Sequence, residues 1–126
     1  MPVIVKRILF ITYLLVIMIV AVFPFSAAGV GAMNRVHIMT FRLDHLLHVL
    51  AFVPLYPLAY WLFHPHSWQQ RHILLSVSLL IAASAEYVQY FIAYRAWNPA
   101  DLISNLTGVM LGFIVIFVVR KWQRIN

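Results

Sequence analysis

Ionisable and amide side chains lie inside, or at the ends of, segments that are otherwise apolar. Glu86 and Gln89 stand in one such segment, and Asp101 and Asn105 stand at the start of another. A carboxylate placed in membrane hydrocarbon costs about 2.5–3.5 kcal/mol on insertion scales. Its charge must therefore be paired, hydrated in a cavity or removed by protonation. We expect these positions to mark the place where the protein acts.

Glu86 is the strongest candidate, because it has no role as a helix cap. Gln89, three residues later, shares its helix face. If the helix continues to Arg95, Glu86 lies about 13 Å deeper than that arginine and close to mid-membrane. Arg95 and Arg42 would supply cationic partners if a polar cavity reaches down to it. The alternative is a protonated or paired glutamate that locks the helices together.

Asp44 and His48 form a second candidate motif, four residues apart at the start of another apolar segment. This spacing places them on one helix face, where a carboxylate that orients a histidine is a common acid–base arrangement. The alternative for Asp44 is a cap at the helix N-terminus, where negative charge is favoured. His45 faces elsewhere, and we expect it at the membrane interface.

Asp101 and Asn105 lie one turn apart on the last apolar segment. Asn98-Pro99-Ala100-Asp101 also reads as an ordinary helix start, which alone would explain the acid. The amide of Asn105 needs partners inside the bundle, and a neighbouring helix could provide them. Gly108 and Gly112 continue this face and predict close packing against another helix.

No established catalytic template is present. There is no nucleophile elbow, no glycine loop for phosphate and no metal signature. The three acids with His48 could ligate a metal, but such donors do not select one. His64 and His66 have no third ligand in view. We therefore predict no metal site and no cofactor.

The composition requires a membrane protein. Of the 126 residues, 64% are hydrophobic and only 10% are charged, and the mean hydropathy is +0.92. Four apolar runs, 8–25, 46–63, 73–94 and 102–119, are each close to the roughly 20 residues that span a bilayer as a helix. The runs lack strand alternation, which excludes a β-barrel. We predict one domain over 1–126, an all-α bundle of four transmembrane helices.

The cations set the expected orientation. An even number of crossings places both termini on one side, together with six cations, against three on the other. The six are Lys6, Arg7, Arg71, Arg120, Lys121 and Arg124, and the three are Arg35, Arg42 and Arg95. The positive-inside rule therefore places both termini in the cytoplasm. The first run also resembles a secretory signal ending at Ser26-Ala27-Ala28, but at 18 residues it is long for one, and we expect an uncleaved helix.

These polar residues together resemble a known family. The pattern is Asp44-x-x-x-His48, Glu86-x-x-Gln89, Arg95, Asp101-x-x-x-Asn105-x-x-Gly108-x-x-x-Gly112. It is similar to the VanZ-like family, whose best-known member is associated with teicoplanin resistance in glycopeptide-resistant bacteria. Members commonly carry a lysine where this chain has His45, and often Pro-Gly where it has Ala93-Tyr94. The resemblance implies a multi-pass protein of the bacterial cytoplasmic membrane and a link to glycopeptide tolerance.

The residues favour an outward-facing site for an anionic lipid or lipid-linked envelope molecule. Guanidinium groups match phosphate and carboxylate, so Arg95 and Arg42 would hold the anion. Gln89, Asp101 and Asn105 would line the site, and the acid–base groups would be Asp44, His48 and Glu86. One alternative is a noncatalytic scaffold that binds partner helices, or further copies of the chain, through Gly108 and Gly112. A weaker alternative is a proton or ion pathway through Glu86. No nucleic-acid partner is expected.

Overall fold

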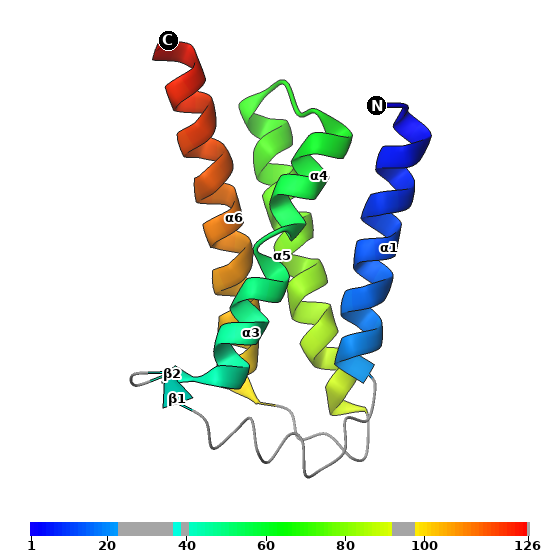
Figure 1. Cartoon of the computed structure of the whole chain (residues 1–126), viewed down its shortest axis with the longest axis vertical. Helices are drawn as coiled ribbons and strands as arrows, with labels where there is room; N and C mark the ends of the chain where they lie inside the picture. The colour runs from blue at the N-terminus through cyan, green and yellow to red at the C-terminus, as the bar shows by residue number, and fades with distance from the viewer. Residues whose placement is uncertain (23–36, 39–40, 92–97, 126) are drawn as a thin grey trace.

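The computed structural model describes residues 1–22, 37–38, 41–91 and 98–125, and it is a bundle of helices (Figure 1). In chain order the helices are α1 (Val3–Val22), α3 (Leu43–Phe52), α4 (Leu55–Phe63), α5 (Trp68–Tyr90) and α6 (Pro99–Ile125). A two-residue antiparallel pair, β1 (His37–Ile38) and β2 (Phe41–Arg42), precedes α3. The fold class is therefore all-α, as predicted.

Four helical spans in the described residues are long and apolar enough to cross a membrane, as the sequence predicted. They are Val3–Val20, Leu43–Phe63, Trp68–Tyr90 and Pro99–Ile125. Each span begins earlier than its apolar run, because hydropathy marks only the hydrocarbon and a helix continues into the polar interface. Positions 23–25 and 92–94, which the runs included, lie outside the described residues. Figure 1 places both termini at the same end of the bundle, and the cytoplasmic location of that end stays a prediction.

The second span is broken, although its apolar run predicted one helix over 46–63. Helix α3 ends at Phe52 and α4 begins at Leu55. Pro54 has no N–H, so it cannot donate to the carbonyl four residues earlier. Tyr13 of α1 donates a hydrogen bond to the carbonyl of Ala51, just before the break, at 2.6 Å. A neighbouring helix thus supplies a donor where the backbone is interrupted, which is how such breaks are tolerated in membranes.

A tight turn joins α4 to α5, as the His-Pro-His-Ser sequence predicted. His64 ends α4 in the left-handed conformation, with φ 47° and ψ 57°. Ser67 then caps α5, since its hydroxyl accepts from the Gln70 N–H while the Gln70 side chain accepts from the Ser67 N–H. The paired caps satisfy backbone donors that a helix start leaves open. This turn fixes α4 and α5 antiparallel at the end of the bundle that carries both termini (Figure 1).

Helix α6 packs against α3 and α4 through its glycines. A Cβ atom on Gly108 would lie 2.4 Å from the carbonyl oxygen of Val49, and one on Gly112 would lie 2.3 Å from that of Val53. Only glycine permits this approach of the backbones, which is the packing that small residues give in membranes. The close contact sets the start of α6 beside the start of α3, and this places the polar side chains of both helices together.

Candidate functional site

Polar side chains of α3, α5 and α6 gather at the end of the bundle opposite the termini. We call them the polar cluster: Asp44, His45, His48, Glu86, Gln89, Asp101 and Asn105. Within it, Glu86, Asn105 and Gln89 are buried, with 0%, 1% and 4% of their surfaces exposed. The remaining four are half-buried. In a bundle whose outer faces are apolar, such burial requires that these groups find hydrogen-bond partners within the protein.

His45 and Asp101 form the shortest polar contact between α3 and α6. The His45 Nδ1 atom lies 2.8 Å from the Asp101 Oδ1 atom, and the two side chains are 19% and 14% exposed. When His45 is protonated, the contact is an ion pair with a charge-assisted hydrogen bond. Because little solvent reaches this pair, the attraction between its charges is screened less than it would be on an open surface. It therefore ties the first turn of α3 to the first turn of α6.

His48 bridges Asn105 and Asp101, one helical turn deeper. Its Nδ1 atom lies 2.9 Å from the Oδ1 atom of Asn105. Since an amide oxygen only accepts, Nδ1 is the donor, and the neutral ring then carries its lone pair on Nε2. That Nε2 atom lies 4.0 Å from the Asp101 Oδ2 atom. The His48 ring is thus held by an amide at Nδ1, and its Nε2 atom faces the Asp101 carboxylate.

These contacts bear on two predictions about α3. The expected acid–base pair was Asp44 with His48, and that pairing stays a prediction; the structure in addition sets an Asp101 carboxylate oxygen 4.0 Å from the His48 Nε2 atom. His45, which was expected at the membrane interface, lies in the first turn of α3 and pairs there with Asp101. The physical reason is that spacing along one helix reports neighbours on that helix only. Here the neighbouring helix comes close enough to supply another carboxylate.

Asp44 stays near this pair and would complete a set of metal donors. One ligand atom each of Asp44, His45 and Asp101 lies within 4.8 Å of the other two. Two carboxylates and an imidazole suit several divalent ions and select none of them. In this structure, however, His45 and Asp101 bond directly to each other. These three residues are the ones that could hold a cation at the polar cluster.

Glu86 connects α5 to the beginning of α6. Its Oε1 atom accepts a hydrogen bond from the backbone N–H of Asn98 at 3.5 Å. Asn98 in turn accepts from the Ala100 N–H through its side chain, at 3.1 Å, where α6 begins. The Glu86 carboxyl group therefore faces the N-terminal end of α6, where backbone N–H groups are free to donate to it.

The depth expected for Glu86 is also corrected. That depth assumed a helix continuing to Arg95, but α5 ends at Tyr90 and is capped by Phe91. Glu86 is therefore about one turn, or roughly 6 Å, from the helix end. It is buried by the neighbouring helices, close to the end of α5 that carries the polar cluster.

The arginines expected to hold an anion are not placed by the structure. Arg95 lies outside the described residues, and only the backbone of Arg42 is described, in β2. Their roles stay predictions. Gly108 and Gly112 face α3 and α4, so a partner helix would have to use a different face of α6.

Comparison with known proteins agrees with the pattern of these residues. The chain matches the VanZ/LLP1 family over residues 10–120, which includes the whole polar cluster. No curated protein and no solved structure matches it significantly. The chain has four spans able to cross a membrane, polar side chains shared among three of them, and this family match over most of its length. The protein is therefore a multi-pass membrane protein of the VanZ/LLP1 family.

Proposed function

We propose that the polar cluster binds an anionic lipid or lipid-linked envelope molecule in the bacterial cytoplasmic membrane. The observation that carries the proposal is the gathering of seven polar residues from three helices at one end of an apolar bundle. Isolated polar groups are costly in lipid, and polar residues inside membrane proteins commonly mark functional sites. With the termini in the cytoplasm, this end faces outward.

The cluster supplies groups of both signs to a bound headgroup. His45 and His48, when protonated, add positive charge next to the arginines expected from the adjoining segments, Arg42 and Arg95. Guanidinium and imidazolium groups donate charge-assisted hydrogen bonds to phosphate or carboxylate. Glu86 and Gln89 form the floor, and Asn105 holds the His48 ring by its Nδ1 atom.

If a reaction occurs, His48 is the residue that moves a proton. Its Nε2 atom is the basic nitrogen, and the Asp101 carboxylate beside it stabilises the imidazolium that forms. A substrate hydroxyl or water that reaches Nε2 would lose its proton there. An effect on glycopeptide tolerance would follow if the bound molecule is an envelope precursor or an anionic lipid that the antibiotic encounters.

The test separates the charge of Glu86 from its role in folding. Glu86→Gln keeps the shape and the acceptor for the Asn98 N–H, so we expect normal accumulation in the membrane. Arg95→Lys keeps the charge but loses the planar fork. We expect both variants to abolish the effect of the protein on teicoplanin tolerance in a sensitive host. The matched control is Ser84→Ala, an exposed position on α5 whose hydroxyl bonds only within its own helix.

Other outcomes favour the alternative functions. Retained activity of Glu86→Gln would support a scaffold and remove the role of the charge. Gly108→Leu does not distinguish a scaffold from a binding site, because Gly108 packs inside the chain and the variant would disturb folding first. A proton pathway predicts instead that vesicles with the purified protein leak protons and that Glu86→Gln abolishes the leak.

A further inference from the structure

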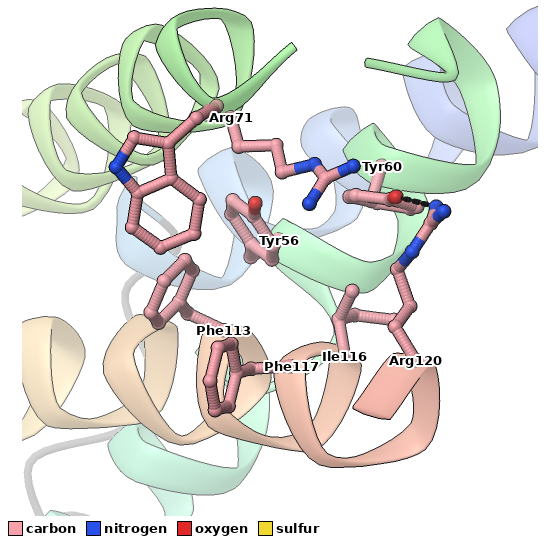
Figure 2. Close-up of a pocket in the computed structure, with 8 residues that line it drawn as sticks. Tyr56, Tyr60, Arg71, Phe113, Ile116, Phe117 and Arg120 are labelled. Atoms are coloured by element: carbon pink, nitrogen blue, oxygen red, sulfur yellow. Dashed lines mark hydrogen bonds between the residues drawn. The ribbon is translucent and has the colours of Figure 1, made fainter. Parts of the chain in front are cut away.

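A second cluster of polar groups lies at the end of the bundle that carries both termini. A small cleft there, with a volume of about 30 Å³, is formed by α4, α5 and α6. Figure 2 shows Arg71 and Arg120 reaching toward Tyr60 from different helices, above the aromatic rings of α6. The residues that carry the argument are Tyr56, Tyr60, Arg71, Phe113, Phe117 and Arg120. None of them belongs to the polar cluster.

The two guanidinium groups are held in place, but their charges are not neutralised by the contacts they make. Arg120 Nη1 donates to the hydroxyl of Tyr60, which is a neutral partner. Arg71 Nη2 donates to the carbonyl of His66 at 3.3 Å. The Arg71 Nε atom is buried and has no hydrogen-bond partner among the described residues. A buried donor on a charged group that has no acceptor is costly, which indicates that an acceptor binds here.

The chain's own carboxylate side chains are too far away to serve. It has three, Asp44, Glu86 and Asp101. Glu86 is fifteen residues from Arg71 along α5, which is about 22 Å, and Asp101 is nineteen residues from Arg120 along α6, about 28 Å. Asp44 lies with Asp101. No carboxylate side chain of the chain can therefore balance this pair of arginines, and an anion from another molecule would.

The surroundings favour the phosphate of a membrane lipid. Arginine binds phosphate through parallel hydrogen bonds, and the cleft has room for about one oxygen-sized group, so the rest of a headgroup would stay at its mouth. Phe117 is half exposed beside the cleft, and Trp68 at its edge is 55% exposed. Such surfaces suit acyl chains and the membrane interface. Basic pockets between helices near the membrane surface are known sites for anionic headgroups.

We propose that Arg71 and Arg120 form a binding site for the phosphate of an anionic phospholipid, in the leaflet on the side of the two termini. The site is separate from the polar cluster and does not depend on its function. Tyr60 positions Arg120 through its hydroxyl, and Arg71 presents its unpaired Nε atom to a phosphate oxygen. By the predicted orientation, the lipid belongs to the cytoplasmic leaflet.

The experiment uses the whole chain, purified in detergent and freed of lipid. Binding of phosphatidylglycerol and of phosphatidylcholine is measured by native mass spectrometry. We expect phosphatidylglycerol to bind about 10- to 30-fold more tightly, as two arginines near one anionic headgroup would give. The double variant Arg71→Gln, Arg120→Gln should lose this preference.

The matched control removes the same charge at the same end of the bundle. Lys121→Gln with Arg124→Gln changes two exposed cations outside the cleft, and it should alter the preference by less than about twofold. Equal losses in both double variants would overturn the proposal, because the attraction would then be general surface charge.

Two further measurements keep the result interpretable. If the glutamine double variant does not fold, Arg71→Lys, which keeps the charge but loses the planar fork, should still weaken phosphatidylglycerol binding several-fold, by about 3- to 10-fold. An unchanged affinity in Arg71→Lys would overturn the proposal. Inorganic phosphate at millimolar concentration should not displace the lipid, and full displacement would identify a site for a free anion instead.

Discussion

Replacing Gly108 with alanine tests whether the close contact of α6 with α3 holds the fold together. The new Cβ atom would lie 2.4 Å from the Val49 carbonyl oxygen and 3.0 Å from the Cβ atom of Phe52. Real Cβ contacts essentially never fall below 3.0 Å, so the helices must separate by at least about 0.6 Å. The obstacle is backbone, which cannot rotate away as a flexible side chain can.

The sign of the effect follows from two opposing magnitudes. Overpacking of this kind costs about 1–3 kcal/mol. Alanine in place of glycine stabilises a helix by about 0.5–1 kcal/mol. The clash is the larger effect, and we expect Gly108→Ala to lower the free energy of unfolding by about 1–2 kcal/mol.

The same displacement should reach the polar cluster. Gly108 follows Asn105 by three residues on the same face of α6, and Asn105 holds His48 at 2.9 Å. Moving α6 away by about 0.6 Å would stretch this contact to the limit of a hydrogen bond. Gly108→Ala should therefore weaken the proposed function as well as the fold.

Thermal unfolding in detergent, followed by circular dichroism, measures the first effect. Thr107→Ala is the matched control, since Thr107 is exposed beside Gly108 and its hydroxyl bonds to Ile103 of its own helix. It should change stability by no more than about 0.5 kcal/mol. If Gly108→Ala is as stable as the wild-type protein, or more so, the inferred backbone contact between α3 and α6 is wrong.

Three other predictions test the remaining contacts. His45→Leu and Asp101→Asn should show a coupling energy of about 1–2 kcal/mol in a double-mutant cycle on stability, because they remove one partly buried pair, whereas additive effects would contradict the pairing. Tyr13→Phe should destabilise the protein by about 0.5–1.5 kcal/mol in thermal unfolding, since it removes the donor at the break in the second span, and an unchanged melting temperature would argue against that role. Topology reporters fused at the C-terminus and at Trp97 should give opposite signals, with the C-terminal one cytoplasmic, and a signal from the outer side at the C-terminus would reverse the orientation.

The amino-acid sequence alone determined the class of the protein and the positions of its spans. An apolar segment of about 20 residues is readable because the bilayer imposes its length and composition on any helix that crosses it. The family pattern was readable for a similar reason, since it rests on residue types at fixed spacings. Gly108 and Gly112 likewise predicted a close helix contact, although not which helix would make it.

Tertiary structure decided which polar groups meet. Spacing along α3 predicted Asp44 as the partner of His48, whereas only the approach of α6 adds Asp101, which lies 2.8 Å from His45 and 4.0 Å from His48. The distance of Glu86 from the end of its helix likewise depended on where α5 ends. Hydropathy does not report that end, because polar and apolar residues can both continue a helix. Contacts within a helix follow from its period, whereas contacts between helices depend on their rotation and approach, which packing of the whole bundle sets.

The cleft at the other end shows the same division. In the sequence, Arg71 and Arg120 are explained by the positive-inside rule. That rule counts the cations on each side of the membrane and does not say which residues they contact. Only the fold brings these arginines, 49 positions apart in the chain, to the same two tyrosines. Hydropathy and charge place a residue at a depth and on a side of the membrane, and the packing of α4 between α5 and α6 decides what it touches there.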